Sequence, residues 1–257
     1  MGRGEEDTDY CFLLGGYDLE MLEIRKILEA QEQKYIDLKL AWGAKLSAYS
    51  GYLNDTGHFV GIELVEDMVK PRHYKAIDHH NEYSGNPSAI EQVAELLGIE
   101  LNRYQHLVAA NDKAYISGME AMGATKDEIA EIREADRRVQ GVTAYDEEMA
   151  VKSIEHYLER IHELLFVEAL TPRLSAITDR LYPFRKLLIT FQYQLVYYGE
   201  GKEKIVRNFD ELIKQGKAYH GGTKNGFFGL VNGAFTIKET REIRNIIIGL
   251  ITKGSHV

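Results

Sequence analysis

Short apolar runs alternate with helical patterns in the first part of the chain, and this alternation constrains the fold more than any other feature. Strands are indicated by YCFLLGG, KYIDLKL, HFVGIELVE and YKAID, whereas LEMLEIRKILEAQEQ and PSAIEQVAELLG space their apolar residues at the helical period. Pro87 and Gly98 mark the start and the end of the second helix. Strands that alternate with helices favour a parallel sheet covered by helices. The sequence therefore predicts an α/β fold.

The pattern changes twice further along the chain. From Asn102 onward it is helical, and after residue 165 strand-like runs follow closely on one another: LFVEAL, RLSAITDRL, KLLITF and QLVYYGEG. An amphipathic helical pattern, KEKIVRNFDELIKQG, and the glycine-rich and aromatic stretch AYHGGTKNGFFGLVNGAFT come next. We predict an α/β domain with a helical extension over residues 1–165 and a smaller α+β domain over residues 166–257.

Charge and composition narrow the classes of function. The 257 residues carry a formal net charge of -9, which argues against a surface that follows the phosphates of a long duplex. The start, MGRGEEDTDY, is unlike a secretory signal, and no apolar run approaches a membrane span. A single cysteine, Cys11, excludes an internal disulfide, and LLGGYDLE lacks the spaced glycines of a dinucleotide site. We expect a cytoplasmic protein that binds neither membranes nor long duplexes.

Acidic and histidine side chains follow several of the predicted strands. Ligands of open parallel sheets bind beyond the carboxyl ends of the strands, so such residues converge there even when they are distant in sequence. Carboxylates together with imidazoles suit divalent first-row metals such as manganese, and two close ions can promote in-line displacement at phosphorus. The candidates are Asp18 and Glu20, Glu66 and Asp67, Asp78, His79 and His80, and Asp112.

The order of these residues resembles that of the DHH phosphoesterase superfamily. An acidic pair follows the first strand, a lone acid follows a later strand, then comes the tripeptide DHH at residues 78–80, and an aspartate lies beyond a helix. Members of that family include manganese-dependent pyrophosphatases, single-strand exonucleases and hydrolases of oligoribonucleotides and cyclic dinucleotides. They typically carry a smaller second domain with a glycine-rich substrate-binding motif, which YHGGTKNGFFG resembles in character and position. The resemblance spans most of the chain.

The resemblance implies roles for individual residues. It implies that the metal ligands are Asp18, Glu20 in place of a second aspartate, Asp67, His79 and Asp112. We add Asp78 to these candidates. His79 and His80 become the catalytic pair, with His80 facing the phosphate. The family's histidine four residues before the first aspartate is Leu14 here, so one metal site is expected to be weak, absent, or rebuilt by His58 or His106. In the second domain, the substrate-binding candidates are His220, Gly221, Gly222 and Lys224.

Simpler interpretations exist for several of these residues. Asp18 and Glu20 also suit the first turn of a helix, where acidic side chains are favourable. Glu66 could take the place of Asp67, and Gly221 with Gly222 could form an ordinary turn.

Two functions from different classes follow. The first is a metal-dependent phosphoesterase, a hydrolase of a small phosphorylated or nucleotide substrate or of a short single-stranded oligonucleotide. Its expected cofactor is Mn²⁺, with Mg²⁺ as the alternative. The second is a catalytically degenerate module with the same fold that binds a nucleotide in regulation, as Leu14 and Glu20 would favour. The sequence is compatible with a homodimer and does not identify the substrate.

Overall fold

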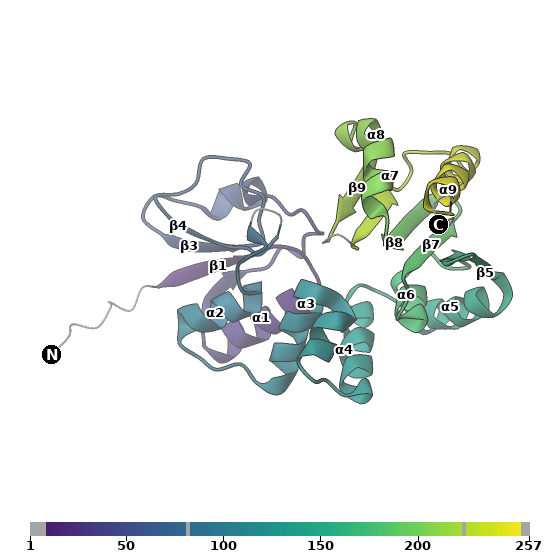
Figure 1. Cartoon of the computed structure of the whole chain (residues 1–257). Coiled ribbons are helices and arrows are strands. Elements are labelled where there is room, and N and C mark those ends of the chain that lie inside the picture. Colours follow the sequence, from purple (N-terminus) through teal and green to yellow (C-terminus); the bar gives the residue numbers. More distant parts are fainter. Residues whose placement is uncertain (1–8, 81–82, 223–224, 253–257) are drawn as a thin grey trace. The chain divides into compact units, whose positions relative to one another are not determined.

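The computed structural model describes residues 9–80, 83–222 and 225–252. The chain divides into two compact units, Met1–Gly141 and Val142–Val257. Each unit has its own sheet and its own hydrophobic cores (Figure 1).

The first unit is built on a four-stranded parallel sheet with strand order β2-β1-β3-β4. Its strands are β1 (Tyr10–Leu14), β2 (Lys34–Ile36), β3 (His58–Ile62) and β4 (His73–Ile77). The chain leaves β1 toward β2 on one side and later adds β3 on the other side, so the order reverses between β1 and β3. In open α/β sheets, such a switch point opens a crevice at the carboxyl ends of the strands.

The two faces of this sheet are covered differently. On one face, Phe12, Val60 and Ile62 pack in a core with helices α1 (Leu19–Ala30), α2 (Ala89–Leu97) and α3 (Arg103–Ala121). On the other face, Leu13 and Phe59 pack with the 3₁₀ helix η1 (Leu46–Tyr52). Helix α4 (Lys126–Val139) packs against α3 and α1 (Figure 1). The two central strands, β1 and β3, are buried on both faces and are accordingly the most apolar, whereas β2 and β4 at the edges are more exposed.

The second unit contains a six-stranded sheet with strand order β5-β6-β7-β8-β10-β9. Only β6 and β7 pair in parallel among its described strands, and the other pairs are antiparallel. The strands are β5 (Leu158–Ile161), β6 (Leu164–Glu168), β7 (Lys186–Phe191), β8 (Gln194–Gly199), β9 (Ala218–Gly221) and β10 (Phe227–Leu230). The helices are α5 (Ala144–Tyr157), α6 (Ser175–Leu181), α7 (Lys202–Asn208), α8 (Asp210–Lys214) and α9 (Ile237–Thr252).

The predicted fold class is confirmed: a parallel α/β sheet flanked by helices is followed by a smaller α+β unit. The units meet at residue 141, whereas the sequence predicted a boundary at 165. The reason is packing, because α5 buries Ala150 in one core with Val167 and Ala176 of the second unit.

Four local expectations differ from the structure. RLSAITDRL forms helix α6 rather than a strand, and its Ala176 and Ile177 are buried. The predicted helix that continued to residue 165 ends at Tyr157, where β5 begins. KEKIVRNFDELIKQG forms two short helices, α7 and α8. Helix α9 was not predicted, although Ile243, Ile247 and Ile251 repeat at the helical period on its buried side. Across the described residues, no helix is both long and apolar enough to span a membrane.

Candidate metal centre

The loop between β1 and α1 supplies two carboxylates. Asp18 is the N-cap of α1, and its Oδ1 accepts a hydrogen bond from the Met21 amide at 2.8 Å. Glu20, in the first turn of α1, is 2% exposed, and its Oε1 accepts a hydrogen bond from the Ile90 amide at 3.1 Å. Ile90 lies in the first turn of α2, so Glu20 satisfies a free amide at that helix start. The second oxygen of Glu20 remains for other partners.

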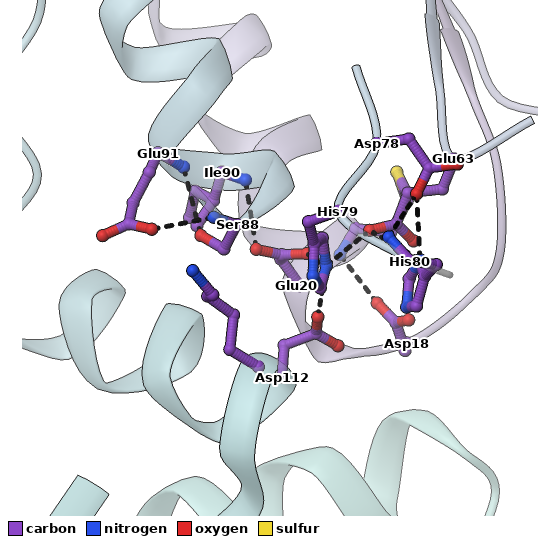
Figure 2. Close-up of polar contacts among 12 residues, drawn as sticks. Asp18, Glu20, Glu63, Asp78, His79, His80, Ser88, Ile90, Glu91 and Asp112 are labelled. Carbon is purple, nitrogen blue, oxygen red and sulfur yellow. Dashed lines mark hydrogen bonds and ion pairs between the residues drawn. The ribbon is translucent and has the colours of Figure 1, made fainter. Parts of the chain in front are cut away.

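Three carboxylates converge on the imidazole of His79 (Figure 2). The His79 Nε2 atom lies 2.7 Å from Asp112 Oδ2, 3.1 Å from Glu63 Oε1 and 3.6 Å from Glu20 Oε2. These residues come from four different segments: the turn after β4, α3, the turn after β3, and α1. His79 is 6% exposed, and the arrangement is therefore almost closed to solvent.

These four polar atoms lack hydrogen bonds. Glu20 Oε2, Glu63 Oε1, His79 Nε2 and Asp112 Oδ2 are all buried, and none of them makes a hydrogen bond of acceptable geometry to a described residue. One imidazole N–H can point at only one oxygen, so three carboxylates cannot all be satisfied by His79. Buried charged oxygens without hydrogen bonds are costly, and proteins normally pair them or bind a metal with them.

The pKa values of the site show an excess of negative charge. Burial, together with the charges of Asp112 and Glu63, raises the pKa of Asp18 to about 7. Burial and the charge of Asp112 raise the pKa of Glu20 well above its usual range. Burial tends to lower the pKa of His79, but its contacts with Asp112, Glu20 and Glu63 outweigh burial and raise that pKa to about 12. A bound cation would reverse these effects on the carboxylates.

His80 lies beside His79 and is held by Asp78. The two imidazole rings are 4.3 Å apart between centroids. Asp78 Oδ1 accepts a hydrogen bond from the His80 amide at 2.8 Å and lies 3.2 Å from His80 Nδ1. The backbone of Asp78 is fixed in turn, because its carbonyl accepts hydrogen bonds from Asn86 and Gln92. The carboxylate of Asp78 thus orients His80, whose side chain is 36% exposed.

Glu63 is the residue that the sequence did not single out. It directly follows Ile62, the last residue of β3, and its amide donates to the Ile77 carbonyl at 2.8 Å. Its φ of 52° turns the chain at the end of the strand. The signal was available in the sequence, since a carboxylate follows the apolar run HFVGI, but the apolar Leu64 and Val65 suggested a longer strand.

The structure brings most of the predicted residues together at the carboxyl-terminal ends of the strands, but Asp67 is not among them. Glu63, His79, His80 and Asp112 form a cluster whose potential ligand atoms all lie within 4.8 Å of one another. Asp67 instead accepts hydrogen bonds from the amide and hydroxyl of Ser47, at 2.9 and 2.7 Å. These bonds lower the pKa of the Asp67 carboxyl. The oxygens of Asp67 therefore cap the start of η1.

No described replacement for the missing histidine lies in the cluster. Leu14 is 1% exposed and belongs to the core between the sheet and helices. His58 is the first residue of β3 and therefore lies at the amino-terminal end of that strand, away from the cluster, and its ring packs on that of His73 with 4.6 Å between centroids. His106 lies in the first turn of α3 and is not part of the cluster. The cluster therefore consists of two carboxylates, Glu63 and Asp112, and two imidazoles, His79 and His80.

The residues present fit a divalent cation. The donors are the carboxylate oxygens of Glu63 and Asp112 and the imidazole nitrogens of His79 and His80, a set suited to a divalent cation rather than to ions that need thiolate ligands. The carboxylate oxygens of Glu20, Glu63 and Asp112 that lack hydrogen bonds all lie within 3.6 Å of His79 Nε2, where an ion could satisfy them.

The glycine motif of the second unit forms a hairpin between β9 and β10. His220 is exposed and pairs with Phe228, and Gly222 has a φ of 69°. The buried ammonium of Lys202 donates to the carbonyls of Gly221 and Gly222, at 3.3 and 3.1 Å. Lys224, the fourth predicted substrate-binding residue of this motif, lies outside the described residues.

Comparison with known proteins gives structural matches alone. No protein-family model and no curated protein sequence matches the chain. A pGpG-specific phosphodiesterase, PggH from Vibrio cholerae, is 12% identical with a TM-score of 0.49 over 96% of this chain and 99% of that chain. A DHH domain from a member of a family of ribosomal proteins is 11% identical with a TM-score of 0.47, over 91% of this chain and 73% of that chain.

RecJ from Thermus thermophilus, in complex with Mn²⁺, is 10% identical with a TM-score of 0.44, over 93% of this chain and 52% of that chain. These three matches have identities of 10–12% and TM-scores below 0.5, so the resemblance to the DHH superfamily stays a prediction from the sequence.

Proposed function

We propose that this chain is a metal-dependent phosphoesterase that acts on a small phosphorylated or nucleotide substrate. One observation carries the proposal: buried carboxylate oxygens of Glu20, Glu63 and Asp112 lie close to His79 Nε2, and none of these four atoms makes a hydrogen bond. A structural ion pair would need one carboxylate for one imidazole, whereas this cluster has three carboxylates within 3.6 Å of His79 Nε2.

Glu63, His79 and Asp112 would hold the ion directly, with Glu20 and Asp18 adding negative charge beside it. When bound, a divalent ion supplies Lewis-acid chemistry, because it lowers the pKa of a water and neutralises charge at a phosphoryl group. The position at the carboxyl ends of β1, β3 and β4 matches the place where open α/β sheets bind ligands. We propose Mn²⁺ as the ion.

His80 is the candidate for proton transfer. Its Nδ1 lies 3.2 Å from Asp78 Oδ1, an arrangement that favours the tautomer with a proton on Nδ1. The neutral ring then keeps an unprotonated Nε2, which can accept a proton or, once protonated, pass it to a leaving oxygen. Its side chain is more exposed than that of His79, at 36% against 4%, so a substrate can reach it.

The second unit would contribute to substrate binding through His220, Gly221 and Gly222. The exposed imidazole of His220 and the left-handed conformation of Gly222 support a site where backbone amides approach an anion. Lys202 keeps the two glycine carbonyls occupied, which favours the amide side of the turn for a ligand. The substrate would be a nucleotide or a short single-stranded oligonucleotide.

A second candidate function is a nucleotide-binding module without catalysis. The observation that favours it is Leu14, which stands where the DHH family has a histidine and is packed in the core at 1% exposure. A site that holds one ion loosely, or none, would keep the fold and lose hydrolysis. Metal content and turnover separate the two functions.

The test compares the parent with His79→Ala and His58→Ala. Both substitutions remove a histidine from the first unit, but only His79 lies in the cluster. Protein purified without chelator is analysed for metal, and hydrolysis with Mn²⁺ is measured on pyrophosphate, dinucleotides, cyclic dinucleotides and short single strands. We expect His79→Ala to lose metal and turnover while His58→Ala keeps both.

Two results would contradict the phosphoesterase proposal. A folded His79→Ala variant with the parent's metal content and turnover would show that the cluster is not the metal site. Metal binding by the parent without hydrolysis of any substrate in the panel would favour the binding module.

A further inference from the structure

Helix α3 is broken at Ala114 and Tyr115, shortly after Asp112. Ala114 has φ -147° and ψ 19°, and Tyr115 has φ 57° and ψ -149°. The conformation of Tyr115 is at the edge of a region that is otherwise used almost only by glycine, so the backbone is strained there. Helix kinks have identifiable causes, and the sequence NDKAYISG contains no proline. Within the helix, the Ser117 hydroxyl donates to the Ala114 carbonyl at 2.7 Å, and contacts from outside the helix add to this support.

The two halves of α3 are pressed together at the break. A Cβ atom on Gly118 would lie 2.4 Å from the Ala110 carbonyl oxygen and 2.9 Å from the Ala114 Cβ. Gly118 therefore permits the close approach, but it does not explain what holds Tyr115 in its strained conformation. Asp112 lies in the last turn before the break, so the position of its carboxylate depends on this local geometry.

Arg133 of helix α4 contacts both sides of the break. Its Nη1 donates to Asn111 Oδ1 at 2.8 Å, and its guanidinium carbon lies 4.6 Å from the centroid of the Tyr115 ring. Asn111 directly precedes Asp112, and Tyr115 is the strained residue. One planar cation thus holds the residue before the candidate ligand by a hydrogen bond and the strained residue after it by a cation–π contact.

The guanidinium of Arg133 is itself held by Asp136 of the same helix. Asp136 Oδ2 accepts a hydrogen bond from Arg133 Nη1 at 2.7 Å, and Asp136 Oδ1 accepts one from Gln140 at 3.1 Å. Arg133 and Asp136 are 7% and 6% exposed. A buried pair is weak support for stability alone, but it confers a defined geometry when its hydrogen bonds are satisfied. The network therefore has the properties of a rigid support.

We propose that Arg133 is a positioning residue for the metal centre: it holds the break in α3 so that the Asp112 carboxylate faces His79. This inference rests on the proposed function, because it assigns Asp112 to a bound ion. Without Arg133, Asn111 loses a hydrogen-bond partner and Tyr115 loses a cation–π contact that supports its strained conformation. The Asp112 carboxylate then loses its fixed direction while the ligand itself is still present.

The test uses the full chain with Arg133→Met and the matched control Arg103→Met. Arg103 also links α3 to α4, through Glu128 at 3.0 Å, but at the end of α3 away from Asp112. Mn²⁺ affinity is measured by calorimetry, and backbone hydrogen exchange is measured on the metal-free proteins. We expect about 10- to 100-fold weaker Mn²⁺ binding for Arg133→Met, the usual range for residues that orient metal ligands, and less than about a twofold change for Arg103→Met.

A double-mutant cycle distinguishes positioning from general stability. With Asp112→Asn in place, adding Arg133→Met should weaken Mn²⁺ binding no further, because its effect passes through the Asp112 carboxylate. Hydrogen exchange over residues 111–117 should accelerate in the metal-free Arg133→Met protein and not in Arg103→Met. If Arg133→Met does not fold, Arg133→Met/Asp136→Leu replaces it, since that variant leaves no buried unpaired carboxylate at residue 136.

Parent-like Mn²⁺ affinity in Arg133→Met would overturn the inference, and so would equal losses in the two arginine variants. Independent effects of Arg133→Met and Asp112→Asn would overturn it as well. If the parent binds no metal, the proposed function fails, and the exchange experiment still decides whether Arg133 holds the break. Unchanged exchange over residues 111–117 would then overturn this inference on its own.

Discussion

Replacing Asp18 with Asn should stabilise the metal-free protein at neutral and alkaline pH. The Asp18 carboxyl is largely buried next to Asp112 and Glu63, and its pKa is raised from 3.8 to about 7. Because the folded chain holds this proton more tightly than the unfolded chain, the parent loses stability as the pH rises from about 4 to about 7. Asn carries no charge, so the unfolding free energy of the variant does not fall with pH through this group.

The size of the effect follows from the pKa change. A rise from 3.8 to about 7, at about 1.4 kcal/mol per pKa unit, corresponds to about 4 kcal/mol above pH 7. At pH 5 the same linkage gives about 1.7 kcal/mol, and below the unfolded-state pKa it vanishes. The N-cap is kept, because Asn caps a helix about as well as Asp and can retain the bond from the Met21 amide.

The assay is urea unfolding in the presence of chelator, at about pH 5, 6, 7 and 8. The expected result is a free-energy difference between Asp18→Asn and the parent that grows with pH up to about pH 7. The control is Asp127→Asn, which removes one negative charge from the exposed surface of α4 and should show no such growth. A difference that is constant with pH, or a variant less stable than the parent at pH 8, would refute the reasoning.

The remaining predictions concern metal binding and the close approach of strand ends. Glu63→Gln should weaken Mn²⁺ binding at least about tenfold while Asp67→Asn changes it less than about twofold, since only Glu63 lies in the cluster; equal losses in calorimetry would count against this assignment. The rise in melting temperature on adding Mn²⁺ should be larger at pH 8 than at pH 6, because Asp18, with a pKa of about 7, must be deprotonated beside the ion; a shift independent of pH would contradict this. Gly15→Ala should lower the unfolding free energy by about 2 kcal/mol or more, because its Cβ would lie 2.3 Å from the Ile62 carbonyl oxygen. An unfolding free energy in urea equal to that of the parent would contradict this.

The sequence by itself determined the class of fold. Alternating apolar runs and helical periods fixed the parallel sheet of the first unit, because a strand buried on both faces must be apolar throughout. Sequence position also indicated Asp18, Glu20, Asp78 and the histidines, since each lies shortly after a strand that the apolar pattern reveals. These are local signals, which can be detected without knowing which segments lie next to one another in the fold.

Segments whose structure depends on partners were less predictable. RLSAITDRL has apolar residues at spacings that suit a short strand or a short helix, and packing of Ala176 and Ile177 against α5 and β7 selects the helix. The boundary between the units likewise depends on which sheet α5 covers, and that choice is made by contacts between distant segments.

Only the tertiary structure decided which carboxylate enters the candidate metal centre. Ile62, the last residue of β3, pairs with Leu14 and Ile77. Glu63 then turns the chain with its positive φ, and its amide donates a hydrogen bond to the Ile77 carbonyl. The chain beyond is drawn to the other face, where Leu64 is buried, and Asp67 is held by its bonds to Ser47.

The same holds for the direction of Asp112. Its place in a helical pattern was visible in the sequence, but the break that follows it is maintained by Arg133, twenty-one residues further along. A local pattern specifies which residues can form a helix or a strand. The end of a strand and the break in a helix were set here by hydrogen bonds and packing from other segments, and those contacts exist only in the folded chain.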